Sequence, residues 1–378
     1  MVGDGLDTIA AALGRVLAEG SDLVCVTGGL GPTHDDLTME AVARATGRRL
    51  VLDPGALAMV QERHAGIRLD EDVRRAVQEK QASLPEGARV LPPPGTAPGC
   101  MLVHEGVVVV VLPGPPWELT SMWEAALPEE PLAGVLARAQ APDERILRLQ
   151  GVPESVLIGV VEGIDPDVWG RLRVGICARA GELEVTVRAR PDDSWAADAL
   201  VERIAEGIGG ALYSRDGSTV DQVVAEALIA RGQTVAVAES CTGGGLGARL
   251  TDRAGSSAYM LGGVISYADA VKTSLLGVDP EVIQRHGAVS AECAEQMALG
   301  ARRVLGSDWA LSITGVAGPG GGTPDKPVGL VFIGLAAPDG SVRHVEHRRG
   351  GDRAAIRNGA VVGALHLLRR ALSEPHGA

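Results

Sequence analysis

The chain has 378 residues, of which 46% are hydrophobic, 22% charged and 2% aromatic; this length and composition exclude wholesale disorder and predict two or three folded domains. Its 48 acidic residues outnumber 35 basic ones, and the formal charge of −13 argues against nucleic-acid or anionic-membrane partners, as does the shortage of aromatic side chains for base stacking. No apolar run approaches the roughly 20 residues of a membrane span, and five scattered cysteines without a CxxC pair predict reduced thiols and a cytoplasmic protein.

The first 140 residues alternate between helical and strand patterns. Apolar residues recur at helical spacing over 6–18, 37–45 and 117–126, and short apolar runs predict strands over 22–27 and 107–112. The valine run at 107–112 is typical of a strand buried on both faces of a parallel sheet. Repeated strand, loop and helix predict a doubly wound α/β domain.

Residues 141–215 follow a different pattern. Strands are expected over 145–149 and 182–190 and helices over 154–161 and around 197–204, which predicts a small α+β module. Over residues 216–378 the alternation resumes and predicts a second α/β domain. Its expected helices cover 220–230, 242–250, 290–305 and 354–372, and its strands cover 234–238, a segment ending at Ile265, 309–314 and 328–336.

In the second α/β domain, a predicted strand runs into Glu239-Ser240-Cys241 and then a glycine-rich helix start. Unpaired N–H groups at a helix N-terminus attract an oxyanion or a phosphate, and a hydroxyl beside them is a plausible nucleophile. Alternatively, Ser240 or Thr242 serves only as the N-cap of that helix.

Tyr267, Asp269 and Lys272 follow the next predicted strand. We expect Asp269 to be the N-cap of a short helix and Lys272 to lie in its first turn, where the helix dipole and partial burial disfavour the ammonium form. A neutral lysine can act as the base for a serine nucleophile, with a tyrosine as relay. The alternative is a surface lysine whose aliphatic part covers Tyr267.

A loop rich in glycine and proline, residues 315–329, follows the predicted strand 309–314. It lacks the GxxxxGK[ST] spacing of a P-loop, but its glycines would let the backbone approach a phosphate closely. Arg353 and Arg357, one turn apart on the last helix, could clamp that phosphate or could be ordinary solvated arginines.

The first domain has a comparable segment, Thr27–Thr38, in which a strand feeds a glycine turn. Asp35 and Asp36 could hold a divalent metal ion that bridges a diphosphate, or could cap the following helix. Residues 95–99 and 112–116 are two more backbone-rich loops at strand ends, where open α/β sheets bind ligands.

Taken together and in this order, these segments resemble the CinA family, the competence/damage-inducible proteins. The matching stretches are TGGLGPTHDDLT, KQASLP, GTAPG, LPGPPWEL, AESCTGG, ISYADAVK, ITGVAGPGGGTPDKPVG and GGDRAAIR. The resemblance implies a MoaB/MogA-like domain over 1–140, associated with metal-dependent ADP-ribose pyrophosphatase activity, and a KH-type module over 141–215. It also implies a PncC-like amidase over 216–378, which would convert nicotinamide mononucleotide (NMN) to nicotinate mononucleotide and ammonia in pyridine nucleotide recycling.

The resemblance also implies functional residues. The catalytic set falls on Ser240, Tyr267 and Lys272, and no cofactor would be needed for the amidase. Substrate and phosphate contacts fall on Thr242, Gly243, Gly244, Thr314, Gly315, Gly318, Gly320, Gly321, Arg353 and Arg357. In the first domain the nucleotide would contact Gly28, Gly29, Gly31, Thr33 and Thr38, and a divalent metal ion would bind Asp35 and Asp36.

The chain departs from the family pattern in three places. It opens directly at the Val-Gly-Asp motif, without the strand, turn and helix that usually precede it, so we expect an impaired pyrophosphatase. Proline stands for asparagine at Pro92, and Asp269 replaces the asparagine after the catalytic tyrosine, where a carboxylate would favour the charged form of Lys272 and slow catalysis.

Two other functions stay open at this point. The first domain could be a molybdopterin-type nucleotide-binding enzyme, because the glycine turn with its aspartates is shared. The whole chain could instead be a competence- or DNA-damage-associated interaction protein without catalysis. In either case we expect a homodimer, because small-residue α/β proteins with phosphate loops are often dimers.

Overall fold

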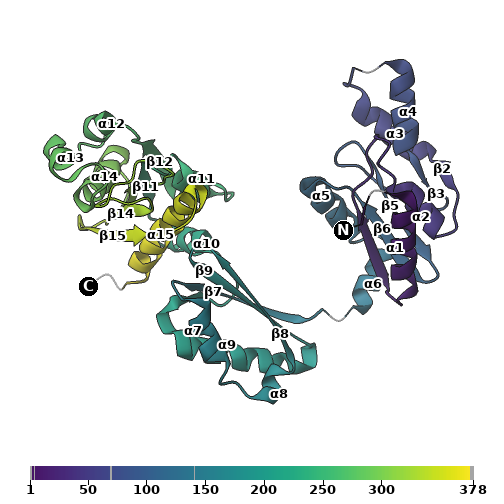
Figure 1. Cartoon of the computed structure of the whole chain (residues 1–378), viewed down its shortest axis with the longest axis horizontal. Helices are drawn as coiled ribbons and strands as arrows, with labels where there is room; N and C mark the ends of the chain where they lie inside the picture. The colour runs from purple at the N-terminus through teal and green to yellow at the C-terminus, as the bar shows by residue number, and fades with distance from the viewer. Residues whose placement is uncertain (1, 4, 69, 140, 375–378) are drawn as a thin grey trace. The chain divides into compact units, whose positions relative to one another are not determined.

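The structure is a computed structural model that describes residues 2–3, 5–68, 70–139 and 141–374. Packing divides the chain into two units, residues 1–140 and 141–378. Each unit has its own sheets and cores (Figure 1). No helix in the described ranges combines the length and hydrophobicity of a bilayer-spanning segment.

A run of consecutive valines, whose side chains alternate between the two faces of the sheet, forms the centre of unit 1. β6 (Val107–Leu112) is buried along its whole length. Val109 and Val111 join the core on one face of the sheet, whereas Val108 and Val110 join the core on the other. Helices pack on both faces, as in a doubly wound fold, and the expected fold class is confirmed.

The sheet of unit 1 has the strand order β1-β6-β5-β4. β6 lies parallel to β1 (Leu23–Thr27) but antiparallel to β5 (Gly99–His104), which pairs antiparallel with β4 (Arg89–Leu91). The sheet is therefore mixed, and the expectation of a parallel environment for the valine strand is wrong on one side. Glu105 and Gly106 explain the difference, because both have positive φ and such a pair closes a tight hairpin between antiparallel strands.

The helices expected near residues 6–18, 37–45 and 117–126 are present as α1, α2 and α5. The remaining strands β2 and β3 form a separate two-stranded antiparallel sheet. These elements of unit 1 are α1 (Leu6–Ala18), α2 (Thr38–Ala45), β2 (Leu50–Leu52), α3 (Pro54–His64), α4 (Glu71–Gln81), β3 (Ser83–Pro85), α5 (Pro116–Ala126) and α6 (Leu132–Arg138).

Residues 141–215 form a small α+β module within unit 2. Its elements are β7 (Asp143–Gln150), α7 (Glu154–Val161), α8 (Pro166–Trp169), β8 (Leu172–Arg179), β9 (Glu182–Ala189), α9 (Ser194–Ile208) and β10 (Leu212–Ser214). The strands form an antiparallel sheet in the order β10-β7-β9-β8. Leu200 and Ile204 of α9 share one core with Leu147 and Val185 of this sheet.

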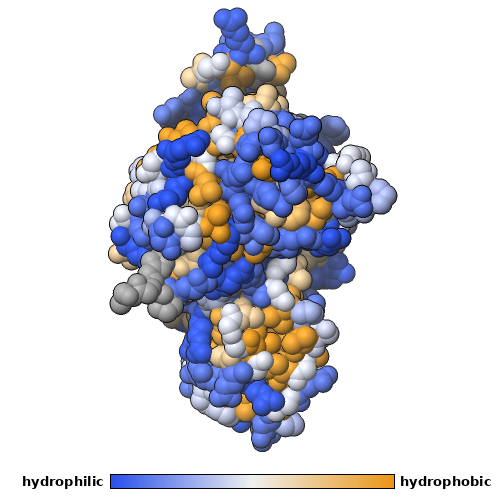
Figure 2. All heavy atoms as spheres, turned by 90° about the vertical axis from the view of Figure 1, so that its left-hand side faces the viewer, coloured by the Kyte–Doolittle hydropathy of each residue, from blue (hydrophilic) through white to orange (hydrophobic). Residues whose placement is uncertain are grey.

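An apolar groove of about 500 Å³ lies among α7, α8 and the sheet of this module. Ile158 and Trp169 on its walls are each 44% exposed. Apolar side chains gather visibly on this part of the surface (Figure 2). Glu162 is the one charged residue among the described residues that line the groove.

The C-terminal domain is built on a sheet with the order β12-β11-β13-β14-β15. β11 (Val235–Glu239) lies between two parallel neighbours, β12 (Met260–Ile265) and β13 (Trp309–Gly315), whereas β14 (Leu330–Ala336) and β15 (Val342–Arg348) are antiparallel. The helices are α10 (Val220–Arg231), α11 (Gly245–Thr251), α12 (Asp269–Ser274), α13 (Pro280–His286), α14 (Ala291–Leu305) and α15 (Arg353–Ser373). α15 shares a core with one face of β11, and α14 with the other.

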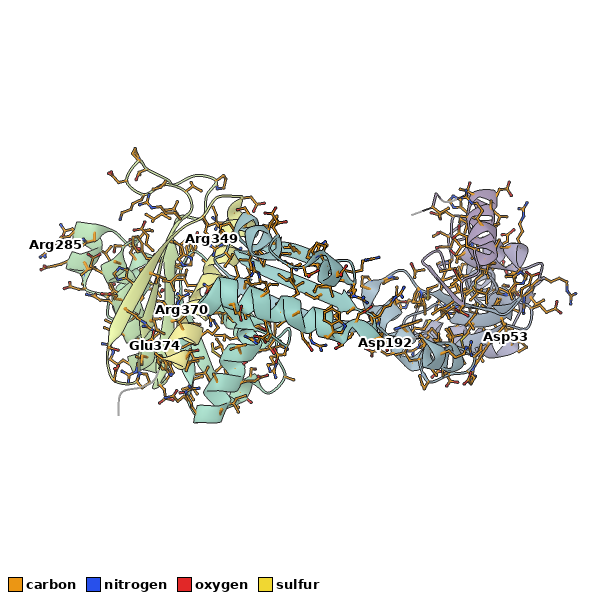
Figure 3. All side chains as sticks on the ribbon, turned by 90° about the horizontal axis from the view of Figure 1, so that it is seen from below. Asp53, Asp192, Arg285, Arg349, Arg370 and Glu374 are labelled. Atoms are coloured by element: carbon orange, nitrogen blue, oxygen red, sulfur yellow. The ribbon has the colours of Figure 1, made fainter. Side chains whose placement is uncertain are left out.

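Contacts from α15 and from Arg349, the residue after β15, connect the module to the C-terminal domain. The imidazole Nε2 of His366, a fully buried residue of α15, lies 2.9 Å from the Glu182 carboxylate at the start of β9. Arg349, labelled in Figure 3, donates a hydrogen bond to the Ala180 carbonyl in the β8–β9 turn (3.0 Å). The module and the C-terminal domain thus meet through polar contacts at the tip of one hairpin.

Candidate active site

The segments that follow β11, β12 and β13 meet at one edge of the C-terminal sheet. In the parallel register, Glu239 at the end of β11 lies opposite Ile265 of β12 and Ile313 of β13. The Ser240 N–H donates to the Ile313 carbonyl (2.9 Å), and the Ser266 N–H donates to the Glu239 carbonyl (2.8 Å). Three stretches of sequence that we singled out for chemistry therefore leave the sheet side by side.

Ser240 begins a turn that requires glycine. The Gly243 N–H donates to the Ser240 carbonyl (3.1 Å), and Gly243 and Gly244 have φ of 59° and 97°, where a side chain would be strained. α11 begins only at Gly245, with Gly244 as its N-cap. The alternative that Ser240 or Thr242 caps this helix is therefore wrong, and the Ser240 hydroxyl, in a residue only 9% exposed, is left for another role.

The N–H groups at the start of α11 already have a partner. The Glu239 carboxylate, in a residue 1% exposed, accepts hydrogen bonds from the N–H groups of Gly244 (3.1 Å), Leu246 (3.0 Å) and Gly247 (2.8 Å). The expectation of an open anion site at this helix N-terminus is wrong, because a carboxylate of the chain fills it. The Thr242 N–H, three residues before the start of α11, makes no hydrogen bond within the described residues, and the Thr242 hydroxyl is buried without a partner there.

Lys272 is buried, so the alternative of a surface lysine is wrong. It is 1% exposed, and its Nζ donates to the Tyr267 carbonyl (3.2 Å) and lies 3.3 Å from the Asp269 carboxylate. Asp269 is the first helical residue of α12 and Ala268 is the N-cap, which places Lys272 in the last turn and not the first. The expected role of the helix dipole at Lys272 is therefore also wrong. The Tyr267 side chain itself is 63% exposed.

The two arginines at the start of α15 point back to this site. Arg357 Nη2 donates to the Thr242 carbonyl (2.6 Å), and Arg353 Nη1 donates to the Gly318 carbonyl (2.8 Å). Arg357 Nε is buried and has no partner among the described residues. The structure thus brings both arginines to the serine turn and the glycine-rich loop, as a phosphate clamp would require.

The glycine-rich loop is anchored at both ends. The Thr314 hydroxyl donates to the Ala288 carbonyl (2.7 Å), and Lys326 donates to the His286 carbonyl. A Cβ on Gly315 would lie 2.7 Å from the Leu330 carbonyl oxygen, so that glycine serves close strand packing. Within the loop, Gly318 and Gly321 have positive φ, whereas a Cβ on Gly320 would meet open space. The backbone between these anchors is the part that can face a ligand.

The nearby thiols are poor nucleophiles. Burial raises the pKa of Cys241, next to Ser240, to about 11, although the charge of Arg357 works in the opposite direction. Burial likewise raises the pKa of Cys293, to about 11. Both thiols are protonated at neutral pH and the thiolate is the reactive form, so the serine hydroxyl is the better candidate.

The glycine turn of unit 1 is shaped by close contacts. Gly28 and Gly29 have φ of 87° and 66°. A Cβ on Gly29 would lie 2.4 Å from the Thr38 hydroxyl, and a Cβ on Gly31 would lie 2.4 Å from the Asp36 carboxylate. Larger residues would displace Thr38, which we expect to contact a nucleotide, and Asp36, which we expect to bind a metal ion.

Asp35 and Asp36 both bind Thr33. The Asp36 carboxylate accepts hydrogen bonds from the Thr33 N–H (2.9 Å) and hydroxyl (2.6 Å); the same hydroxyl contacts Asp35 and holds the pKa of that carboxyl below its ordinary value. The alternative that either aspartate caps α2 is wrong, because its N-cap is Leu37 and no side chain bonds there. The described residues contain no group of three His, Cys, Asp or Glu side chains that could hold a metal ion.

A cavity of about 140 Å³ opens beside this turn, with Gly29, Gly31, Asp36, Lys80 and Gln81 in its walls. Gln81 is 4% exposed, and its carbonyl oxygen has no partner among the residues that the structure describes. Sequence reasoning assigned no role to Lys80 or Gln81; the signal available was their place in the KQASLP stretch.

Comparison with known proteins adds family information to this geometry. Residues 217–372 match the family described as CinA C-terminal domain, and residues 1–131 match the probable molybdopterin binding domain. A CinA-like protein of Mycobacterium sp. (strain MCS) is 47% identical over 379 residues, 98% of this chain and 89% of that protein; one from Mycolicibacterium gilvum (strain PYR-GCK) is 46% identical over 380 residues, 99% and 89% respectively. The solved competence/damage inducible protein CihA from Agrobacterium tumefaciens is 41% identical and covers 42% of this chain and 98% of its own, with a TM-score of 0.39.

Proposed function

The chain belongs to the CinA family, and on that premise we propose that residues 216–378 hydrolyse the carboxamide of NMN to nicotinate mononucleotide and ammonia. The observation that supports the proposal is that the segments bearing Ser240 and the buried Lys272 follow neighbouring strands at one end of the sheet, where Arg357 also reaches the Thr242 carbonyl. Amide hydrolysis needs a nucleophile, a base and a hold on the substrate. This edge offers a candidate for each.

In the first half of the reaction, the Ser240 hydroxyl attacks the carboxamide carbon while Lys272, as the neutral amine, takes its proton. The electron pair of the C=O bond moves onto oxygen, and the N–H of Thr242 is the donor left to stabilise that oxyanion. The intermediate then collapses: the C–N bond breaks, the amide nitrogen receives the proton from Lys272, and ammonia leaves. Ser240 is left as the nicotinoyl ester.

In the second half, water replaces the amine. Lys272 takes a proton from the water molecule, whose oxygen attacks the ester carbon, and the proton then returns to the Ser240 oxygen as the ester bond breaks. The products are nicotinate mononucleotide and free enzyme, so one amide and one water give one acid and one ammonia. Tyr267, whose side chain is exposed, would orient the substrate or relay a proton in this proposal.

The substrate phosphate binds to the arginines in this proposal. Because Glu239 fills the N-terminus of α11, that helix end cannot take the phosphate. Arg353 carries positive charge beside the backbone of the glycine-rich loop, and Arg357 beside that of the serine turn; arginine is well suited to a phosphate.

For unit 1 we propose nucleotide binding in the cavity beside Gly29 and Gly31, with ADP-ribose as the substrate that the family suggests. Lys80 supplies positive charge near the Thr33 carbonyl, and Gln81 supplies an unpaired acceptor. ADP-ribose cleavage with and without added Mg²⁺ tests whether this unit is a pyrophosphatase. Binding of a pterin without cleavage of ADP-ribose would favour the molybdopterin-type alternative instead.

The apolar groove of the module does not favour a nucleic-acid backbone as its ligand. The described residues that line the groove include an acidic residue, Glu162, and no basic one. A phosphate backbone is normally held by lysine and arginine.

The decisive experiment measures ammonia release from NMN by the full chain, with and without a chelator. We expect turnover that resists the chelator and falls by at least about 10³-fold in Ser240→Ala, with unchanged thermal unfolding. Ser257→Ala, which changes an exposed serine of the same domain, is the matched control and should keep the wild-type rate. Wild-type turnover in Ser240→Ala would remove Ser240 from the nucleophile role, and absence of turnover in the wild type would refute the amidase.

A further inference from the structure

Glu239 lies between the central strand and the serine turn, and no step described above uses it. It is the last residue of β11 and is 1% exposed. One carboxylate oxygen accepts the N–H groups of Gly244 and Leu246, and the other accepts the N–H of Gly247. Three backbone N–H groups at the start of α11 therefore converge on one side chain.

These hydrogen bonds close the turn that carries the nucleophile. The turn runs from Ser240 to Gly243, directly between Glu239 and the first N–H that its side chain accepts. The near end is held by the sheet, because the Glu239 carbonyl accepts the Ser266 N–H and the Ser240 N–H donates to β13. The carboxylate fastens the far end of the turn to this rigid near end.

We propose that Glu239 is a positioning residue of the amidase, which fixes the turn that presents the Ser240 hydroxyl. The Glu239 side chain also occupies the N-terminus of α11. The substrate phosphate is therefore bound by Arg353 and Arg357 instead. The inference rests on the proposed amidase function and adds to it a residue that contacts neither the substrate nor the reacting atoms.

A groove beside the carboxylate allows a chemical test. Glu239, Gly244 and Gly247 line an opening of about 450 Å³ between α11 and β12. In a Glu239→Ala variant, formate can enter through this opening and place a carboxylate near the three freed N–H groups. A general loss of stability would not be repaired in this way.

The experiment determines kcat and KM for NMN in the full chain as wild type, Glu239→Ala and Glu239→Gln. We expect kcat to fall about 10- to 100-fold in both variants, since a displacement near 1 Å at a reacting group has that effect. Formate should raise the kcat of Glu239→Ala but not that of Glu239→Gln, whose amide still fills the space. Inorganic phosphate should inhibit Glu239→Ala at a lower concentration than the wild type, because the opened helix end binds it.

A matched control removes another carboxylate that accepts a hydrogen bond from α11. Asp221 of α10 accepts a hydrogen bond from Arg249 of α11 (2.9 Å), so Asp221→Asn loosens α11 without touching the serine turn. We expect a lower Tm in Asp221→Asn but a kcat near the wild-type value.

The outcomes separate the two proposals. Wild-type kcat in both Glu239 variants, or an equal loss of kcat in Asp221→Asn, overturns the positioning role while the amidase stands. If Glu239→Ala does not fold, the kcat values of the other two variants are compared. A kcat of Glu239→Gln well below that of Asp221→Asn supports the positioning role, and equal values overturn it. No NMN hydrolysis by the wild type refutes the amidase and this inference with it.

Discussion

Unit 1 and the C-terminal domain each contain a strand with a parallel neighbour that runs into a glycine turn and a helix, and the two differ in where the carboxylates lie. After β11, the carboxylate belongs to the last strand residue, Glu239, and points forward onto the helix N–H groups. After β1, the carboxylates of Asp35 and Asp36 come later, bind Thr33 and leave α2 without a side-chain cap. The same sequence pattern therefore builds one closed helix end and one uncapped end.

Both turns also receive a cation on a backbone carbonyl. Arg357 donates to the carbonyl of Thr242 in the C-terminal domain, and Lys80 donates to the carbonyl of Thr33 in unit 1. Among the described residues, a buried lysine follows the neighbouring strand in the C-terminal domain alone: Lys272, after β12. The comparison teaches that a glycine turn supplies backbone, whereas charged residues from elsewhere in the chain decide its chemistry.

The largest effect is expected when the lysine that distinguishes the C-terminal turn, Lys272, is replaced. Lys272→Met should lower NMN turnover by about 10²- to 10⁴-fold, the range for loss of a general base. Lys272→Arg should lose activity as well, because arginine keeps the charge but does not become a neutral base. Steady-state ammonia release measures both, and an active Lys272→Arg enzyme would show that only the positive charge matters.

The next largest effect is expected on removal of Arg357, which donates to the Thr242 carbonyl of the serine turn. Arg357→Ala should raise KM for NMN by about 10-fold or more, because a charge-assisted hydrogen bond to phosphate contributes on the order of 1.5–3 kcal/mol. Nicotinamide riboside, which has no phosphate, should be affected less. Arg231→Ala removes a similar contact, to the Leu372 carbonyl at the other end of α15, and should leave both KM values unchanged; equal changes in the two variants would argue against a phosphate clamp.

A smaller effect is expected from the carboxylate beside the lysine. The Asp269 carboxylate lies 3.3 Å from Lys272 Nζ, and Asp269→Asn removes its charge with little change of shape. Because Asp269 is exposed to solvent, this ion pair contributes little, and we expect kcat for NMN to change by about fivefold or less. A loss of kcat as large as that of Lys272→Met would show that the ion pair itself is required for turnover.

The smallest effect concerns the turn of unit 1. The Thr33 hydroxyl lowers the pKa of Asp35, so this carboxylate stabilises the fold above the pKa of an unfolded aspartate and loses that contribution as pH falls below it. Thr33→Val should raise the Asp35 pKa toward its ordinary value, measured by NMR titration of the carboxyl carbon. An unchanged Asp35 pKa would mean that Thr33 does not hold this carboxylate in solution.

Much of the fold was predictable because hydrophobic spacing is local. The apolar stripes of α1 and α15 and the apolar runs of β6, β11 and β13 are found where the sequence predicts them. The start of α11 was placed too early, because the glycines at 243 and 244 adopt left-handed φ and delay the helix. The valine run alone does not predict the mixed sheet of unit 1, because the direction of β5 relative to β6 depends on the tight Glu105-Gly106 turn between them.

The sequence by itself determined the main helices and strands, the doubly wound class and the candidate segments for chemistry, since these depend on residue spacing along a few turns of chain. Only the tertiary structure decided which polar groups are occupied: Lys272 is buried, Glu239 fills a helix end that looked open, and Arg357 reaches Thr242 across 115 residues of sequence. Burial and hydrogen bonding depend on neighbours that the fold brings together from distant parts of the chain. That is why the type of site could be predicted locally while its electrostatics could not.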